Sequence, residues 1–371
     1  MSKIKIGFIG VGQIGESHIN EYKKIADCEI VAACDINEAR LNEICDKYDI
    51  KKRFTHIGQM LREADIDAVD VCLHNNLHAP ATIAVLNAGK HAYCEKPMAG
   101  TYFDALAMHE AAQKTGKKLH IQLALIYNDA AKAAKRLIDG GHLGNIYHIR
   151  SCGFRRRGRP YVDGYGSKEF VNSRTARGGA LFDMGVYRMS QLLWLAGLPK
   201  LERVVGKTYQ EMAVDPKRRE ISGFNVEELG TGYAVYEKNI SLDVIEAWAI
   251  HADSTGRSMI AGSKGGLLFD PLTYHTLTED MVVDTTVDCG ALNYRNKNVH
   301  TENAVYESSQ VHWINALLGR CELLPTAKIA LETSLLQEGI FLSNSLGREV
   351  TADEIRKMSK STALELPNLA L

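Results

Sequence analysis

The stretch Gly10-Val11-Gly12-Gln13-Ile14-Gly15 decides the fold of this 371-residue chain. It follows an apolar run at residues 3–9, and residues 14–25 have the spacing of an amphipathic helix. G-x-G-x-x-G between a strand and a helix is a dinucleotide-binding fingerprint, whereas the same letters in another context carry little information. The sequence therefore predicts a nucleotide-binding βα unit at its N-terminus.

The three glycines of this turn have separate physical tasks. Gly10 makes the tight turn, Gly12 lets the backbone approach a pyrophosphate, and Gly15 lets the helix pack closely on the strand. The helix N-terminus then presents N–H groups and a partial positive charge to the phosphates. We expect Gln13 and Ile14, which lie in the same turn, to contact the cofactor as well. The alternative is a glycine-rich turn that binds no nucleotide.

An acidic residue after the second apolar run selects between the two nicotinamide dinucleotides. Asp35 follows the run at 29–34 and lies 20 residues beyond Gly15, where a carboxylate accepts hydrogen bonds from the adenosine ribose. The same carboxylate repels a 2′-phosphate, so the predicted cofactor is NAD rather than NADP. Arg40 lies five residues after Asp35, and its positive charge would weaken this preference for NAD.

Apolar and amphipathic segments alternate through the first 123 residues. The predicted strands cover residues 3–9, 29–34, 68–73, 91–94 and 118–123. The predicted helices cover residues 14–25, 41–48, 79–88 and 102–115. Strands separated by helices indicate a doubly wound parallel sheet of the α/β class, so we assign residues 1–123 to a Rossmann domain.

The pattern changes after Asn128, where strand-like stretches follow one another. These strands are expected at 145–154, 201–208, 232–236, 240–250, 257–261 and 266–269, with a hairpin turn at Lys238-Asn239. Helices are expected near 130–139, 184–195, 304–318 and 327–345. Residues 124–371 are therefore expected to form an α+β domain with a large open mixed sheet, which binds substrate and mediates oligomerisation. The helix near 327–345 is expected to pack back on the first domain.

Composition excludes several classes of partner. The formal net charge is −1 and 24% of residues are charged, so neither nucleic acid nor a membrane surface is expected. No apolar run reaches the ~20 residues of a membrane span, and glycines interrupt the N-terminal apolar stretch. The eight cysteines form no C-x-x-C pair and are typical of a reduced cytoplasmic protein. An open sheet needs covering, so a homo-oligomer, a dimer or higher, is expected.

Two histidines follow the third predicted strand. His74 and His78 have the spacing of metal ligands on a helix, but the metalloprotease pattern also requires a glutamate between them. The intervening residues begin with Asn75 and include no glutamate. Because doubly wound sheets bind ligands at the carboxyl ends of their strands, we expect His74, Asn75 and His78 to contact the cofactor. A structural role is the alternative for His78, and no metal is expected.

Two further motifs carry a family resemblance. Glu95-Lys96-Pro97 follows the fourth strand, and residues 178–187 read G-G-A-L-F-D-M-G-V-Y, ending in Tyr187. In order with the glycine turn and Asp35, these motifs resemble the Gfo/Idh/MocA family, which includes glucose–fructose oxidoreductase, inositol dehydrogenases and dihydrodiol dehydrogenase. The resemblance covers nearly the whole chain, and the pairing of the two motifs is more specific than either half.

The resemblance implies the catalytic residues. It places Glu95 and Lys96 in the cofactor site, with Lys96 beside the nicotinamide, and it turns Asp183 and Tyr187 towards the substrate. We expect Lys96, Asp183 and Tyr187 to be catalytic, with either Lys96 or Tyr187 as the proton acceptor. Many members carry histidine in place of Tyr187, but a tyrosine still exchanges a proton where an ammonium group lowers the phenol's pKa. The alternative is that Tyr187 is a core residue of the helix at 184–195.

The chain also departs from the family pattern. Many members carry N-x-R after the fifth strand, whereas residues 122–127 read Q-L-A-L-I-Y and contain no arginine. We expect Gln122 to replace part of the missing cofactor contact.

The polar segment at 155–179 precedes the Asp183 motif and suits a carbohydrate. Hydroxyl groups need donors and acceptors, and sugar ring faces stack on aromatic rings, so Arg156, Tyr161 and Tyr165 are candidate substrate contacts. A solvated basic loop or a subunit contact is the alternative. The segment resembles a bacterial subgroup that oxidises the 3-hydroxyl of the sugar in glycosides.

The expected function is transfer of hydride between a ring secondary alcohol of a sugar, cyclitol or glycoside and the nicotinamide of NAD. One alternative is a redox-assisted NAD-dependent glycosidase, which would cleave a glycosidic bond with no net NADH. A second is a non-catalytic regulator that senses the dinucleotide. Lys96 and Asp183 argue against the regulator, because a sensor needs neither of them.

Overall fold

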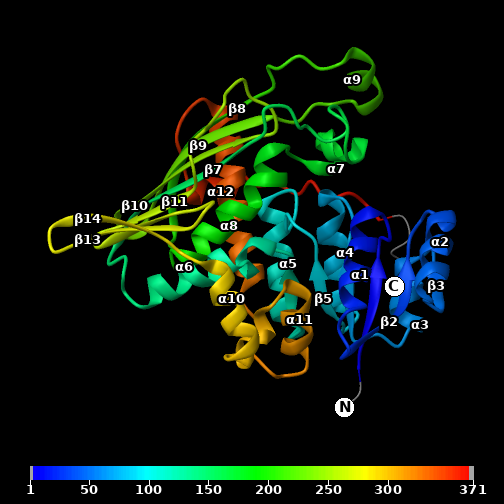
Figure 1. Cartoon of the computed structure of the whole chain (residues 1–371). Helices are drawn as coiled ribbons and strands as arrows, with labels where there is room; N and C mark the ends of the chain where they lie inside the picture. The colour runs from blue at the N-terminus through cyan, green and yellow to red at the C-terminus, as the bar shows by residue number, and fades with distance from the viewer. Residues whose placement is uncertain (1–2, 367–371) are drawn as a thin grey trace. The chain divides into compact units, whose positions relative to one another are not determined.

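The computed structural model describes residues 3–366, which form two compact units. The first unit holds the described residues up to Gln122, with Val305–Leu331 and those from Ser361 onward. Its six-stranded sheet, blue to cyan in Figure 1, has the order β3-β2-β1-β4-β5-β6 and is parallel throughout. The strands are β1 Ile4–Ile9, β2 Cys28–Cys34, β3 Lys52–Phe54, β4 Ala68–Val71, β5 His91–Cys94 and β6 Leu119–Ile121. The helices are α1 Gln13–Tyr22, α2 Glu38–Tyr48, α3 Ile57–Glu63, α4 Asn75–Asn87, α5 Tyr102–Thr115 and α11 Ser309–Leu317.

The central strands explain why this sheet forms. All four residues of β4 are buried, and so are the last four residues of β1. Burial of successive residues, which are apolar here except for Asp70, is typical of a parallel strand when helices cover both faces of the sheet. The predicted doubly wound sheet is confirmed. The apolar pattern does not predict β3, because this edge strand has three residues and two of them are exposed.

A late segment of the chain completes the core of the first unit. Trp313 of α11 is fully buried in the same hydrophobic cluster as the β1 and α1 side chains. Ser309 Oγ and Thr326 Oγ1 lie 2.9 and 3.0 Å from the two ring nitrogens of His120. Residues 305–331 therefore belong by packing with the nucleotide-binding unit, so the two expected domains interleave along the chain.

The second unit, Leu123–Ala304 with Glu332–Lys360, holds the nine-stranded sheet. Its order is β14-β13-β12-β11-β7-β10-β9-β8-β15, in which β7 and β10 are parallel neighbours and the other pairs are antiparallel. The strands are β7 Ile146–Phe154, β8 Leu201–Tyr209, β9 Leu229–Tyr236, β10 Ile240–Ala247, β11 Met259–Gly262, β12 Gly265–Leu268, β13 Thr273–Thr278, β14 Met281–Thr286 and β15 Val350–Thr351. The helices are α6 Asp129–Asp139, α7 Ser173–Ala176, α8 Val186–Leu195, α9 Pro216–Ser222, α10 Cys289–Asn298, α13 Ala352–Met358 and α12 Thr326–Leu346, which begins in the first unit. The expected α+β architecture with a mixed sheet is confirmed.

The predicted hairpin turn is also present. Lys238 and Asn239 have φ values of 61° and 58° between β9 and β10, which pair Tyr236 with Ile240. Two consecutive positive φ values give the turn the twist that a tight hairpin requires, and asparagine tolerates this conformation better than most residues.

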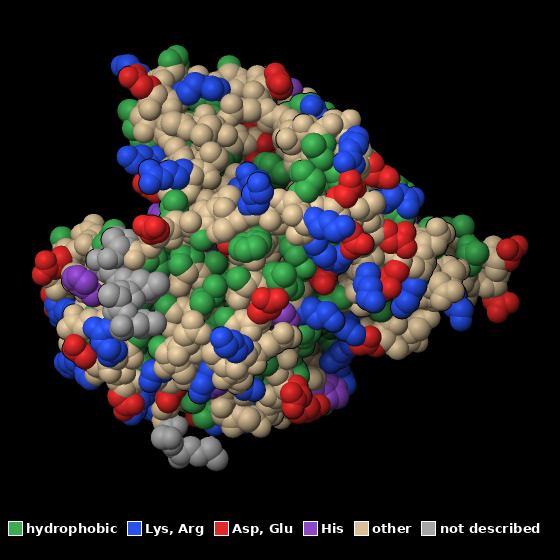
Figure 2. Space-filling view, turned by 180° about the vertical axis from the view of Figure 1, so that it is seen from behind, with side chains coloured by type: hydrophobic (Ala, Val, Ile, Leu, Met, Phe, Trp, Pro, Cys, Tyr) green, Lys and Arg blue, Asp and Glu red, His purple; other side chains and the backbone are tan. Residues whose placement is uncertain are grey.

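Helix α12 packs on one face of the nine-stranded sheet. A Cβ at Gly206 or Gly232 would lie 2.7 or 2.9 Å from Ile340, so both glycines permit the close approach of the helix. On the opposite face Val205 and Tyr233 are exposed, and the β13–β14 hairpin projects with acidic and hydrophobic side chains at its end (Figure 1 and Figure 2). Within residues 3–366, no helix combines the length and apolar character needed to span a membrane.

Candidate active site

The glycine turn between β1 and α1 has the geometry that a pyrophosphate requires. A Cβ on Gly10 would lie 2.3 Å from the carbonyl oxygen of Cys72, and one on Gly15 would lie 2.2 Å from the carbonyl oxygen of Gly10. A Cβ on Gly12 would meet no atom within 4 Å, so this position opens to space. Helix α1 begins without a side-chain cap, which leaves its first N–H groups for a ligand. The residues present therefore fit a dinucleotide.

Asp35 lies directly against this turn. Its Oδ2 accepts the Val11 N–H at 2.9 Å and its Oδ1 accepts the Asn37 N–H at 2.8 Å, which fixes the carboxylate at the end of β2. Arg40 forms ion pairs with Glu16 and Glu43, so two carboxylates already offset its charge. The fixed carboxylate of Asp35 and the neutralised charge of Arg40 therefore both favour a ribose hydroxyl over a 2′-phosphate at this position.

We predict that the protein binds NADH roughly tenfold or more tightly than NADPH, the effect of one charge-assisted hydrogen bond. The Asp35→Ser variant, which lacks the repelling carboxylate, should reduce this ratio. Fluorescence titration of each variant with the two cofactors measures it. Tighter binding of NADPH by the unmodified protein would contradict the assignment of Asp35.

The predicted residues after β4 separate into two kinds. His74 precedes the N-terminus of α4 and Asn75 begins that helix, and both are half-buried at the carboxyl edge of the sheet. His78 is fully buried, with its ring nitrogens 2.8 and 3.0 Å from the carbonyl oxygens of Pro97 and Leu73. Burial lowers the pKa of His78, against the opposing effects of these two carbonyl contacts. This placement supports the structural alternative for His78.

Glu95 belongs to a buried charge cluster that the sequence does not predict. Its Oε1 lies 2.9 Å from His18 Nε2, and His18 Nδ1 lies 2.9 Å from Asp70 Oδ2. Burial opposes the charge of His18, but the contacts with Asp70 and Cys72 together outweigh burial and raise the pKa of His18 well above its usual value. Burial likewise opposes ionisation of Glu95, but the hydrogen bond from His18 leaves the pKa of Glu95 lowered. An imidazolium between two carboxylates therefore supports the Glu95-Lys96 segment.

The same cluster contains atoms at metal-ligand distances. The ligating atoms of His18, Asp70 and Cys72 lie within 4.8 Å of one another. Burial raises the pKa of the Cys72 thiol well above its usual value, and this thiol donates to Asp70 Oδ1 at 3.2 Å. These groups already pair with one another, since His18 contacts Asp70 and the Cys72 thiol donates to the same carboxylate, so we assign the cluster a structural role.

Replacing His18 should destabilise the fold. His18→Gln leaves Asp70 and Glu95 buried without their cation, which is expected to cost about 3 kcal/mol of unfolding free energy, measured by urea denaturation at pH 6. The raised pKa of His18 means that its contribution is complete below its unfolded pKa and is lost as the pH rises through its folded pKa. The deficit of the variant should therefore shrink at high pH. The exposed His56→Gln is the matched control, and equal losses in both variants would contradict the role of the cluster.

Lys96 and Gln122 lie at the carboxyl ends of neighbouring strands. Lys96 follows β5 and donates its backbone N–H to Glu95 Oε2 at 3.0 Å. Gln122 follows β6, and its backbone N–H donates to Cys94 O at 2.9 Å. The side-chain Oε1 of Gln122 is buried and has no hydrogen-bond partner among residues 3–366. A buried acceptor of this kind fits a ligand that supplies an N–H donor.

In the second unit, one helix carries both of the predicted substrate-facing residues. The helix begins earlier than residue 184, with a π-helical turn at Leu181–Gly185 that continues into α8. Asp183 and Tyr187 are both half-buried, and Asp183 Oδ2 accepts the indole N–H of Trp248 at 3.0 Å. Single π-helical turns are frequent at functional sites. The sequence did not single out Trp248, which follows the apolar strand β10.

The predicted carbohydrate-binding loop divides into a surface and an anchor. Arg156 and Tyr165 are exposed, and the Tyr165 ring lies under the guanidinium of Arg155. Tyr161 is half-buried, with the guanidinium of Arg218 5.0 Å from its ring centre. The Tyr165 hydroxyl also donates to the carbonyl oxygen of Gly158 at 3.2 Å, so this ring is held within the loop.

Arg159 is the anchor of this loop. It is 1% exposed and forms ion pairs of 2.8 Å with both Asp163 and Glu228. The basic run 155–159 is therefore only partly a surface feature. The spacing of Arg159 and Asp163 is a sequence signal for the local ion pair, whereas nothing local indicates Glu228.

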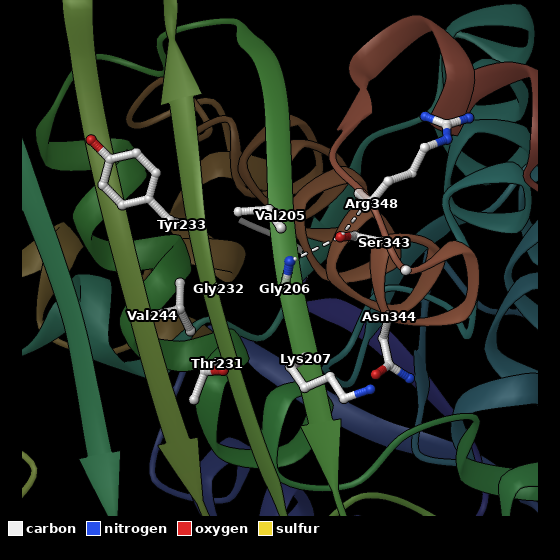
Figure 3. A pocket seen from close by; sticks show the side chains of 11 residues that line it. Val205, Gly206, Lys207, Thr231, Gly232, Tyr233, Val244, Ser343, Asn344 and Arg348 are labelled. Atoms are coloured by element: carbon white, nitrogen blue, oxygen red, sulfur yellow. Dashed lines mark hydrogen bonds between the residues drawn. The ribbon is translucent and has the colours of Figure 1, made fainter.

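A further cavity lies elsewhere in the second unit. It has a volume of about 560 Å³ between β8, β9 and the C-terminal end of α12 (Figure 3). Ser343 Oγ accepts the Gly206 N–H at 3.0 Å and donates to Arg348 O at 2.7 Å beside it. Its lining residues are all different from the predicted site residues, so this cavity is separate from them.

Comparison with known proteins finds a matching family domain for the main part of each unit. Residues 4–123 match the oxidoreductase family with an NAD-binding Rossmann fold, and residues 131–268 match the GFO/IDH/MocA C-terminal domain. The chain is 30% identical over 212 residues to D-glucoside 3-dehydrogenase of Escherichia coli K12, covering 57% of this chain and 59% of that protein. It is 34% identical over 145 residues to inositol 2-dehydrogenase of Salmonella typhimurium LT2, covering 38% and 43% respectively.

The aligned segments thus span about half the length of these curated relatives. The fold resembles the WlbA dehydrogenase of Bordetella pertussis, solved with NADH and UDP-GlcNAcA, with a TM-score of 0.76 at 22% identity over 94% of this chain and 98% of that one. The two domain matches cover most of the chain. The first spans the six-stranded sheet, and the second spans most of the nine-stranded sheet. Residues 4–123 are an NAD-binding Rossmann domain, and the chain belongs to the Gfo/Idh/MocA oxidoreductase family.

Proposed function

We propose that the protein is an NAD-dependent oxidoreductase that acts on a ring secondary alcohol of a sugar, cyclitol or glycoside. The observation that carries the proposal is the position of Lys96. It follows β5 at the carboxyl edge of the same parallel sheet whose β1–α1 turn fits a dinucleotide. Ligands of doubly wound sheets bind at this edge, so Lys96 follows a strand at the edge where an alcohol substrate and the cofactor are expected to meet.

The first unit supplies the cofactor contacts. The first turn of α1 holds the pyrophosphate, with Gln13 and Ile14 beside it, and Asp35 binds the adenosine ribose. His74 and Asn75 at the N-terminus of α4 are further contacts. The buried Oε1 of Gln122 accepts an N–H from the carboxamide of the nicotinamide. Glu95 is buried, and its carboxylate accepts a hydrogen bond from the Lys96 backbone N–H, so it positions Lys96.

The proposed chemistry assigns separate tasks to the catalytic residues. Bound NAD supplies the acceptor for the hydride. Asp183, held by Trp248, orients the reacting hydroxyl, and Tyr187 accepts its proton. Lys96 stabilises the negative charge that develops on the substrate oxygen as the proton leaves. The reverse reduction uses the same residues in the opposite order.

The carbohydrate class is supported by the loop at 155–166. Arg156 offers hydrogen-bond donors, and Tyr161 and Tyr165 offer ring faces for a sugar. Two curated relatives, named D-glucoside 3-dehydrogenase and inositol 2-dehydrogenase, act on ring alcohols by their names. We propose a glycoside and its sugar 3-hydroxyl as the finer assignment.

A panel of sugars, cyclitols and glycosides tests the function. Incubation with NAD should produce NADH and a ketone product with at least one member, followed by absorbance and mass spectrometry. Cleavage of a glycosidic bond without net NADH would instead identify the redox-assisted glycosidase. Dinucleotide binding without either reaction across the panel would overturn the proposal in favour of a sensor.

We also propose a homo-oligomer in the cytoplasm. The exposed Val205, Tyr209 and Tyr233 lie on the sheet face opposite α12, where a second copy would cover them. All eight cysteines are unpaired, as in a reducing compartment. On the face shown in Figure 2, basic and acidic side chains are interspersed, which does not favour a nucleic acid partner.

A further inference from the structure

A buried carboxylate closes the start of the helix that carries Asp183. Glu227 precedes β9, and its Oε2 accepts the Gly179 N–H at 2.6 Å while its Oε1 accepts the Leu181 N–H at 3.0 Å. These are N–H groups of the first helical turn, which have no partner within the helix. The helix begins without a side-chain cap of its own, so Glu227 supplies the cap from another element.

The capped first turn packs closely against Trp248, which contacts Asp183. A Cβ on Gly179 would lie 1.9 Å from the carbonyl oxygen of Glu227 and 2.9 Å from the Trp248 ring. Trp248 in turn donates its indole N–H to Asp183. A shift of the first turn therefore changes the contact between Trp248 and Asp183.

The neighbouring glutamate anchors the second substrate segment. Glu228 Oε2 pairs with Arg159 at 2.8 Å, and its carbonyl oxygen accepts the Trp248 backbone N–H at 2.7 Å. Two consecutive glutamates thus hold the helix of Asp183 and the loop of Tyr161. Glu228 is held by a cation, whereas Glu227 is held mainly by neutral N–H groups.

The surroundings of Glu227 make its ionisation sensitive to pH. Burial raises the pKa of Glu227 to about 7, against the opposing effects of the Gly179 and Leu181 N–H groups and of Arg177. A polar cavity of about 280 Å³ reaches Glu227, and its other ionisable lining residues are Arg177 and Tyr209. The charged groups on the adjoining elements are Asp183 on the helix and Glu228 with its partner Arg159.

Protonation of Glu227 weakens one of the two contacts. An ionised carboxylate accepts an N–H at each oxygen, whereas a carboxylic acid carries a proton on one oxygen and accepts more weakly there. We propose that Glu227 is a positioning residue, whose ionised form fixes the helix of Asp183 and Tyr187 for catalysis and whose protonation releases it. This inference rests on the proposed function, because it treats these two residues as the substrate-facing pair.

The pH dependence of turnover is the first test. In the unmodified protein, kcat should rise with pH through an apparent pKa of about 7. Glu227→Gln presents an amide N–H₂ to one backbone donor and mimics the protonated acid, so kcat above this pKa should fall about tenfold and lose the rise. Glu220→Gln removes an equal charge from the exposed face of α9 and is the matched control. A rise that persists in Glu227→Gln overturns the proposal.

The indole N–H of Trp248 gives a readout that needs no substrate. In ¹⁵N-labelled protein its NMR signal, assigned with Trp248→Phe, should titrate near neutral pH in the unmodified protein and stay constant in Glu227→Gln. The titration of the unmodified protein remains a test even if the glutamine variant fails to fold. A signal that does not move between about pH 6 and 8, within one unit of the pKa, overturns the positioning role. A moving signal without NADH formation on any substrate supports the positioning of the helix and overturns the proposed function instead.

Discussion

Lys96→Ala should lower kcat by about 10²- to 10³-fold, the range for loss of one group that stabilises developing negative charge, while the Kd for NADH changes little. Lys96 follows β5 at the carboxyl end of this strand, and in the proposed function its charge acts on the substrate oxygen. The contact that holds this segment uses the backbone N–H of residue 96 and the carboxylate of Glu95, and an alanine retains it. The proposed phosphate and ribose contacts lie at the start of α1 and directly after β2, so cofactor binding should be preserved. Steady-state kinetics and fluorescence titration measure the two effects separately.

The control for this experiment is a lysine of the same unit without a proposed role. Lys114 is exposed in the last turn of α5, and Lys114→Ala should leave both kcat and NADH binding unchanged. Lys96→Arg retains the charge with a different shape and should recover part of the lost rate. Unchanged turnover in Lys96→Ala would remove Lys96 from the chemistry.

The first sheet is the part of the fold that local sequence predicts best. Glycines at fixed spacing, a positive φ of 88° at Gly10 and apolar runs in central strands are all local requirements. The turn at Lys238-Asn239 is predictable for the same reason, because two residues determine it. Local rules do not predict β3, whose three residues depend on the pairing of β2 for their strand conformation.

Packing between distant segments is the part that local sequence does not predict. Trp313 completes the core of the first unit from a position more than two hundred residues beyond β5. A helical pattern reveals that α11 has an apolar face but not which sheet it covers. The interleaving of the two units is therefore a property of tertiary contacts.

The candidate site shows the same division. Gly12, Asp35, Lys96 and Asp183 belong to spaced motifs, so the sequence identifies them. The residues that hold them belong to no motif. His18 pairs with Glu95, and Trp248 donates a hydrogen bond to Asp183. A lone histidine on a helix gives no sign that two buried carboxylates face it, because those carboxylates come from separate strands. Sequence motifs thus identify the proposed catalytic residues, whereas the residues that contact and hold them are found only in the structure.

Tyr187→Phe should lower kcat by about 10²-fold or more while leaving the unfolding free energy nearly unchanged. The substitution removes one oxygen and keeps the ring, so the packing of the half-buried side chain on α8 is retained. If Tyr187 accepts the substrate proton, no other group on this helix replaces it, because the carboxylate of Asp183 is held by Trp248 to orient the hydroxyl. Tyr233→Phe, on the exposed face of β9, removes the same atom and should have no effect on kcat. A kcat of Tyr187→Phe within a few-fold of the unmodified enzyme would transfer the role of proton acceptor to Lys96.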